Sequence, residues 1–260
     1  MASIYDNLVY LGYCGVFVAT VPYLLGPVFI RFTQRRAARP VVEVIENEAT
    51  PEFVEAHFSR SEAALAEMGI VPVGRLFVPG KLRSYLLVME NTSVQGSAVA
   101  GVLSSDDDRN PKVEYVTFRN QFTDGTNVFT SNQPDVSILA PMPNRVELDV
   151  PEEQNPAAVY AIHVAMVERF GKGKTPKPLD LQDIAANSRK ASMEIMEEQV
   201  KAGLFYLSGD SLWYKPTWKG ACLMTWKLCW PIKHIRVWRA KKKREELLRS
   251  LNLAGQSARV

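Results

Sequence analysis

The sequence contains few of the residues from which catalytic and metal sites are usually built. Among its 260 residues there are three histidines and three cysteines. Cys14 lies in an apolar run, and Cys222 and Cys229 are spaced to share one helical face, so neither a disulfide framework nor a metal cluster is indicated. A G-x-S-x-G motif and a Cys–His pairing are also missing, which leaves nucleophilic catalysis without a candidate residue.

Two further motifs fall short of the chemistry that they resemble. Residues 171–175 read Gly-Lys-Gly-Lys-Thr, as at the end of a P-loop, but Glu168 stands where that motif requires its first glycine. Prolines follow this segment, whereas a P-loop leads into a helix, so it is interpreted as a flexible basic linker. Residues 106–111 carry three aspartates without the spacing of a calcium loop. The sequence therefore predicts no metal and no cofactor, and it favours a non-catalytic protein.

Long uncharged runs are equally scarce, with one exception. Residues 8–30 form a run of 23 residues without a charged side chain. At about 1.5 Å of rise per residue, a helix of this length can cross a hydrocarbon core of roughly 30 Å. A cleaved signal peptide is disfavoured because no basic residue precedes the run and no small-residue cleavage site follows it. A buried core helix is disfavoured by the length of the run. The sequence thus predicts a single transmembrane helix.

The flanks of this run predict its orientation. No lysine or arginine precedes Leu8, whereas four basic residues follow Ile30, namely Arg31, Arg35, Arg36 and Arg39. Since basic flanks stay in the cytoplasm, we expect a single-pass membrane protein with its N-terminus outside and its body cytoplasmic, in the inner membrane if the host is a bacterium.

The net charge of +3 conceals an uneven distribution. Residues 31–39 carry four basic side chains and no acid, and residues 232–250 carry eight basic and two acidic ones. Between them, residues 40–231 carry 18 basic and 25 acidic side chains. An acidic body between two basic segments suits a protein whose ends contact an anionic membrane surface, and it suits a general nucleic-acid binder less well.

The middle of the chain predicts an α+β domain over residues 40–171. A helix is expected over residues 51–68, started by Thr50 and Pro51, and another over residues 156–170, started by Asn155. Between them, short β-branched and aromatic segments separated by turn residues predict an antiparallel meander flanked by the helices. Its clearest hairpin turns at Asp124–Gly125, for which a type I′ turn is expected.

A linker over residues 172–178 is expected to separate this domain from a smaller one over residues 179–260. There Asp180 is a candidate cap for a helix that ends near Ala202, followed by a hairpin and by two helices that meet at Pro231. The succession of helix, glycine, β-wing and T-x-K-G turn in residues 203–220 resembles the tail of a winged-helix domain. The resemblance covers about 50 residues, rests on turn chemistry that unrelated wings share, and implies duplex DNA as a partner.

All five tryptophans of the chain lie within 26 residues of the second domain, and a basic run follows them. Tryptophan favours the headgroup layer of a bilayer, and adjacent lysine and arginine can reach anionic phosphates. The alternative is that the tryptophans form the core of the small domain. We expect a basic amphipathic helix on the membrane surface, with anionic lipid headgroups contacted by the four arginines of residues 31–39 and by Trp226, Trp230, Trp238, Arg239, Lys241, Lys242, Lys243 and Arg244.

A ligand pocket between the predicted sheet and helices is the remaining site hypothesis. It would be lined by His57 and His163 from the two helices and by Thr117 and Arg119 from a strand. For each histidine the alternative is an edge-of-core residue with a satisfied ring nitrogen. The strand residues can equally form the solvated face of a half-exposed sheet.

Three functions are compatible with these patterns. The favoured one is a membrane-anchored, non-catalytic module that docks a protein partner or a lipid at the membrane surface. The second is a membrane-tethered, winged-helix-like DNA-binding regulator, and the third is a small apolar-ligand carrier or enzyme that uses the pocket.

Overall fold

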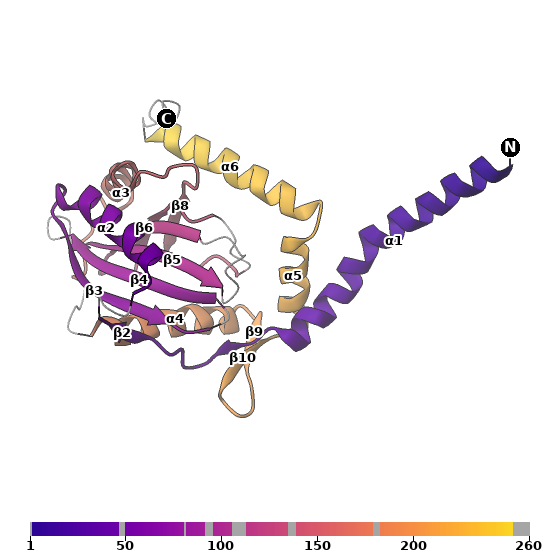
Figure 1. Ribbon diagram of the computed structural model, residues 1–260, viewed down its shortest axis with the longest axis horizontal. Helices are drawn as coiled ribbons and strands as arrows, with labels where there is room; N and C mark the ends of the chain where they lie inside the picture. The colour runs from indigo at the N-terminus through magenta and orange to yellow at the C-terminus, as the bar shows by residue number, and fades with distance from the viewer. Residues whose placement is uncertain are drawn as a thin grey trace. The chain divides into compact units, whose positions relative to one another are not determined.

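The computed structural model describes residues 2–46, 50–80, 82–91, 96–105, 113–134, 139–178 and 183–251, with the side chains of helix α1 described only in part up to Ala19 (Figure 1). The chain divides into two compact units. Unit 1 comprises residues 1–39, 137–140 and 193–241, and unit 2 comprises residues 40–136, 141–192 and 242–260. Each unit is therefore assembled from segments that are distant in sequence.

Unit 2 is built on a seven-stranded sheet with the order β2-β3-β4-β5-β6-β7-β8. Neighbouring strands are antiparallel except for β7 and β8, which are parallel. The strands are β2 (Glu43–Ile45), β3 (Ile70–Val78), β4 (Leu82–Asn91), β5 (Gly96–Ser105), β6 (Val113–Gln121), β7 (Asn127–Ser131) and β8 (Arg145–Asp149). The prediction of a mixed α+β fold with a β-meander flanked by helices is confirmed.

The hairpin between β6 and β7 has a different turn from the one predicted. Phe122 N–H donates to the carbonyl of Thr126, Gly125 N–H donates to the carbonyl of Phe122, and Gly125 alone in the turn has a positive φ, of 86°. This is a three-residue loop ending in a left-handed glycine rather than a two-residue type I′ turn. The Asp124 carboxylate accepts from Thr126 N–H at 2.9 Å, which favours the longer loop.

Two helices cover one face of this sheet, α2 (Glu52–Ala66) and α3 (Pro156–Phe170). Asn155 caps α3 by accepting a hydrogen bond from Ala157 N–H, as predicted, whereas Pro51 occupies the cap position of α2 without a side-chain bond. Side chains of both helices pack with the sheet in one core, including Val54, Phe58, Leu65, Met89, Ala100, Val116, Phe118, Val159 and Met166.

The opposite face of the sheet is covered in part by the start of α4 (Ile184–Lys201). Ala185 packs there with Val42, Leu76 and Val88. Asp183 caps α4 by accepting from Ala186 N–H at 2.7 Å, while the predicted cap, Asp180, lies outside the described residues. The last turn of α6 (Ile232–Ser250) also belongs to unit 2, since Leu248 is buried in the main core.

The segment expected to be a flexible linker is bound to the sheet of unit 2. Thr123 N–H donates to the Thr175 carbonyl, and Lys177 N–H donates to the Gln121 carbonyl. The Lys174 ammonium lies 3.0 Å from the Asp124 carboxylate and donates to the Thr126 hydroxyl at 2.6 Å. Residues 172–178 therefore extend the β6–β7 hairpin, and Lys174 is engaged in this structural contact.

Unit 1 combines a small three-stranded sheet with the helices α1 (Ala2–Thr33) and α5 (Trp218–Leu228), together with parts of α4 and α6. Its antiparallel strands have the order β1-β10-β9, with β1 at Arg36–Ala37, β9 at Phe205–Leu207 and β10 at Trp213–Pro216. Thr217 caps α5 by accepting from Gly220 N–H at 3.0 Å. The core contains Ile30, Ala38, Met196, Leu204, Phe205, Tyr214, Ala221 and Met224.

The predicted transmembrane anchor is not borne out. Among the described residues, the structure holds no helix whose length and apolar character suffice for crossing a membrane. The single-pass topology, with the N-terminus outside and the body cytoplasmic, is therefore wrong. Part of the apolar run serves internal packing instead, because α1 contacts α5 and buries Pro27 and Ile30. The sequence-based prediction placed this run in a lipid environment because its local composition is apolar and uncharged.

Candidate functional site

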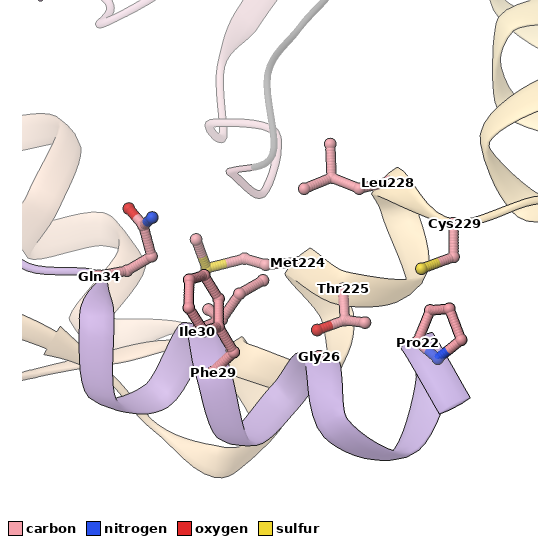
Figure 2. Close-up of a pocket in the computed structure, with 9 residues that line it drawn as sticks. All are labelled: Pro22, Gly26, Phe29, Ile30, Gln34, Met224, Thr225, Leu228 and Cys229. Carbon is pink, nitrogen blue, oxygen red and sulfur yellow. The ribbon is translucent and has the colours of Figure 1, made fainter. Parts of the chain in front are cut away.

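An apolar groove runs between α1 and α5 within unit 1 (Figure 2). Its volume is about 340 Å³, near the lower end of the range for small-molecule sites. One wall comes from α1 and the other from α5, and the lining residues are Pro22, Gly26, Phe29, Ile30, Gln34, Met224, Thr225, Leu228 and Cys229. Figure 2 shows these side chains along the facing sides of the two helices.

Gly26 allows the two helices to approach closely at the floor of the groove. A methyl group added to Gly26 would lie 2.5 Å from the Cγ2 atom of Thr225, which is closer than carbon atoms can approach. The Thr225 hydroxyl donates to the Ala221 carbonyl at 2.9 Å, so its polar atom is satisfied within α5. The threonine therefore presents its methyl group to α1, and the groove floor is apolar.

A ladder of arginine and aromatic side chains lies beside the end of α1. The guanidinium of Arg31 is 4.9 Å from the ring centroid of Tyr206 and 6.0 Å from that of Trp218. The guanidinium of Arg35 is 4.6 Å from the centroid of Trp213. Stacking uses the face of a guanidinium and leaves its N–H edge for hydrogen bonding. Neither arginine donates a hydrogen bond to another described residue.

The tryptophans lie largely on the surface of unit 1. Trp218, Trp226, Trp230 and Trp238 are 54%, 45%, 69% and 62% exposed, and Trp213 is half-buried beneath Arg35. The sequence left open the alternative that the tryptophans form the core of the small domain. The structure contradicts this alternative, because most of them are exposed. The core of unit 1 is formed by smaller apolar residues together with Phe205 and Tyr214.

Most basic residues predicted for a membrane surface are exposed as well. In α6 these are Arg239, Lys241, Lys242 and Lys243, and at the end of α1 Arg35, Arg36 and Arg39 are exposed while Arg31 is half-buried. Arg244 differs, because it pairs with Glu152 and its side chain is 14% exposed within unit 2. Arg244 therefore stabilises this part of α6, and it does not belong to the candidate membrane-contacting surface.

Comparison of the chain with protein-family models, with curated proteins and with solved structures gave no match. The function of this chain is consequently inferred from its own residues.

His163, one of the four predicted pocket residues, is a core residue. It is 2% exposed, with Nε2 2.8 Å from the Asn120 amide oxygen and Nδ1 3.1 Å from the Thr130 hydroxyl. A neutral ring satisfies both partners if Nε2–H donates to Asn120 and Nδ1 accepts from Thr130. Burial lowers the pKa of His163 to about 3, so the ring is uncharged at neutral pH.

His57 makes a separate contact with strand β6. Its Nε2 is 3.2 Å from the Tyr115 carbonyl, and its Nδ1 is 3.2 Å from the Glu114 carboxylate, which also pairs with Arg60 at 2.8 Å. Burial lowers the pKa of His57, and the Tyr115 carbonyl and the Glu114 charge oppose this shift. Neither histidine lies near a group of side chains that could hold a metal, since the described part of the chain contains no such group.

Thr117 and Arg119 lie on the face of the sheet opposite the helices. Their neighbours Phe118 and Asn120 point toward α3, and side chains alternate along a strand. The Thr117 hydroxyl is 2.8 Å from that of Ser131, and Arg119 donates to the Asn127 side chain at 3.1 Å. The four predicted residues are thus not brought together, and core side chains fill the space between the sheet and α2 and α3.

The groove and the arginine–aromatic ladder were not predicted from the sequence. Gly26 was the available signal, since a glycine in an apolar helix marks a place of close approach. The partner that approaches it is α5, about 200 residues later in the chain, and no local pattern indicates that pairing.

Proposed function

We propose that this protein is a non-catalytic module that docks on an anionic lipid surface through the exposed aromatic and basic side chains of unit 1. The observation that carries the proposal is the coincidence of two surface properties. Of the 23 large apolar side chains exposed in the described residues, 19 belong to unit 1, which holds about a third of the chain. The same unit carries 12 basic and 5 acidic residues, whereas unit 2 carries 19 and 23.

Each property supports contact with headgroups. Contiguous exposed apolar surface is unfavourable in water and marks sites of protein or membrane contact. Tryptophan is enriched at the interface between headgroups and hydrocarbon, and each basic residue near an anionic leaflet contributes about 1 kcal/mol. Unit 1, at net +7, offers both kinds of side chain together, whereas unit 2 is at net −4 and carries 4 of the 23 exposed large apolar side chains.

The winged-helix-like alternative explains less of this surface. The helix, the β9–β10 hairpin and the Thr217 turn are present, and the basic charge of unit 1 suits phosphate backbones. Binding to duplex DNA does not require exposed apolar side chains such as Trp230, Leu212 and Phe32, which are 69%, 62% and 76% exposed. A lipid surface uses both the charge and the apolar groups, and it is therefore the partner that we favour.

The test is co-sedimentation of the full chain with vesicles of phosphatidylcholine alone and of phosphatidylcholine with phosphatidylserine. We expect binding to the anionic vesicles that weakens as salt is raised. Neutralising Lys233, Arg239 and Lys241 to glutamine should weaken binding on the order of a hundredfold, from about 1 kcal/mol per residue. Replacing Lys172, Lys177 and Lys190, three exposed residues of unit 2, by glutamine is the matched control and should have little effect.

A second pair of variants tests the aromatic contribution. Trp226→Ala with Trp230→Ala should reduce vesicle binding, while Val44→Ala with Leu82→Ala, at exposed apolar positions of unit 2, should not. Equal binding to neutral and anionic vesicles would contradict the electrostatic part of the proposal. Salt-sensitive binding to a duplex DNA oligonucleotide, with no binding to vesicles, would replace it by the DNA-binding alternative.

A further inference from the structure

The groove between α1 and α5 has the dimensions of a single hydrocarbon chain. Along α1 it extends from Pro22 to Gln34, twelve residues apart, which corresponds to about 18 Å of helix. A volume of about 340 Å³ over that length gives a mean cross-section of about 19 Å². A helix with its side chains is about 10–12 Å in diameter and does not fit. A helix of a protein partner can therefore place only its side chains in the groove and cannot enter it.

The chemistry of the walls excludes other narrow occupants. A β-strand or a polar small molecule carries N–H and C=O groups that need partners when they are buried. The groove offers none along its floor, because the Thr225 hydroxyl already donates to Ala221 and the other lining residues on this side are Met224 and Leu228 of α5 and Cys229, which follows it. An unbranched chain of methylene groups needs no such partner, and its burial is favourable in proportion to the apolar area removed from water.

The two ends of the groove differ in polarity. Near Pro22 and Cys229, the Tyr23 hydroxyl donates to the Trp230 carbonyl and ties α1 to the end of α5. At the other end the lining residue is Gln34, which Arg35 follows directly in the chain. No charged residue lies between Leu8 and Ile30, so the cations of α1 are confined to this end. An anionic head is therefore favoured at the Gln34 end and an apolar tail toward Pro22.

We infer that the groove binds one acyl chain of an anionic amphiphile, with its head at Gln34 and Arg35 and its tail along Gly26 toward Pro22. This inference rests on the proposed lipid-surface function, and it names a site and a ligand class for it. The chain can belong to a bilayer lipid or to a free fatty acid. The shared chemistry is a linear hydrocarbon with an acidic head.

The first experiment measures protection of a cysteine that lines the groove. The full-length protein is treated with a maleimide in the presence and absence of palmitate, and modification is quantified by peptide mass spectrometry. Cys229, which directly follows α5, lines the groove, whereas Cys222, also half-buried and within α5, does not and serves as the internal control. We expect palmitate to slow modification of Cys229 but not of Cys222. Equal protection or no protection would overturn the inference.

The second experiment fills the groove. Leu228→Trp places a large ring at a lining residue that is 52% exposed, and Leu212→Trp adds the same ring at a position 62% exposed and outside the groove. Binding of cis-parinaric acid, followed by its fluorescence, should weaken by about tenfold or more in the first variant, equivalent to at least 1.4 kcal/mol, and little in the second. Equal affinities in the two variants would overturn the site.

Two further measurements test where the anionic head binds and whether the acyl chain belongs to a bilayer lipid or to a free fatty acid. Arg35→Gln should weaken palmitate protection of Cys229 without changing protection by hexadecanol, whereas Arg39→Gln should change neither. Loss of vesicle binding in Leu228→Trp would assign the chain to a bilayer lipid, and unchanged vesicle binding would assign it to a free fatty acid. The docking proposal has a separate test. It is contradicted if the tryptophan and lysine variants described above bind vesicles as well as the parent protein does.

Discussion

His163 shows how a polar residue is accommodated within an apolar core. It stacks on Phe118 at 5.7 Å between centroids and is bound on both ring nitrogens, so its burial leaves no polar atom without a partner. A helix position beside Ile162 was compatible in the sequence with a ligand or with a core residue. The structure places His163 in the core because its two partners, Asn120 and Thr130, come from the facing strands β6 and β7.

The stability of unit 2 should fall in mild acid because of this histidine. The pKa of His163 is lowered from 6.5 to about 3 in the folded state, so between these values the unfolded chain takes up a proton that the folded chain refuses. The free energy of unfolding should decrease as pH falls below 6.5, by up to about 1.4 kcal/mol per pH unit. Urea unfolding followed by far-ultraviolet circular dichroism between pH 7 and pH 5 measures this slope.

Proton NMR of the folded protein is a second test of the burial of His163. The ring protons of His163 should not titrate in NMR spectra of the folded protein down to pH 5. A His163 titration near pH 6.5 would show that the ring is hydrated and would contradict the core assignment.

At the scale of elements, the patterns that depend on neighbouring residues were predictive. The apolar stripe and the Asn155 cap placed α3, and alternation with turn residues placed the meander. Expectations that depended on distant contacts were less accurate. The apolar run near the N-terminus forms a helix as expected, but its close contact with α5 at Gly26 was not visible, and the β6–β7 turn differs because Asp124 binds Thr126.

The start of α5 offers a test at this scale. The Thr217 hydroxyl accepts from Gly220 N–H at 3.0 Å and donates to the Gly203 carbonyl at 2.8 Å, which joins α5 to the end of α4. Thr217→Val keeps the shape of the side chain and should destabilise unit 1 by about 1 kcal/mol or more. Tryptophan fluorescence during thermal unfolding measures this loss, because all five tryptophans belong to unit 1.

Thr217→Ser is the matched variant, since it retains the hydroxyl and should recover most of the stability. If valine and serine were equally tolerated, the hydroxyl would not contribute to the start of α5. The groove wall formed by this helix would then depend on packing alone.

At the scale of the whole molecule, the assembly of unit 1 from distant segments has functional consequences. Residues 1–39 supply α1 and β1, and residues 193–241 supply β9, β10 and α5. Residues 31–39 and the first part of the C-terminal basic segment, residues 232–241, are thereby joined in one unit, while residues 242–250 and most of the acidic residues between the two segments belong to unit 2. The two units consequently differ in net charge, which is +7 for unit 1 and −4 for unit 2.

Removal of residues 1–39 should therefore unfold unit 1 and leave unit 2 folded. Ile30 and Ala38 would be lost from the core of unit 1, whereas the buried residues in the main core of unit 2 all follow Pro40. Amide hydrogen exchange should become fast in β9, β10 and α5 and remain slow in β4, β5 and β6. Unchanged protection of α5 in the truncated chain would show that α1 is not part of its folding unit.

From capping residues, apolar periodicity and turn chemistry, which act over a few neighbouring positions, the sequence predicts most helices and strands of this protein and the distribution of charge along the chain. It fixed neither which tryptophans reach the surface nor which helix packs against Gly26, and it led to a transmembrane assignment that the structure corrects. Those outcomes depend on contacts between residues 26 and 225, or between residues 36 and 214. Only the tertiary structure decides such contacts, since packing is a property of surfaces that distant segments form together.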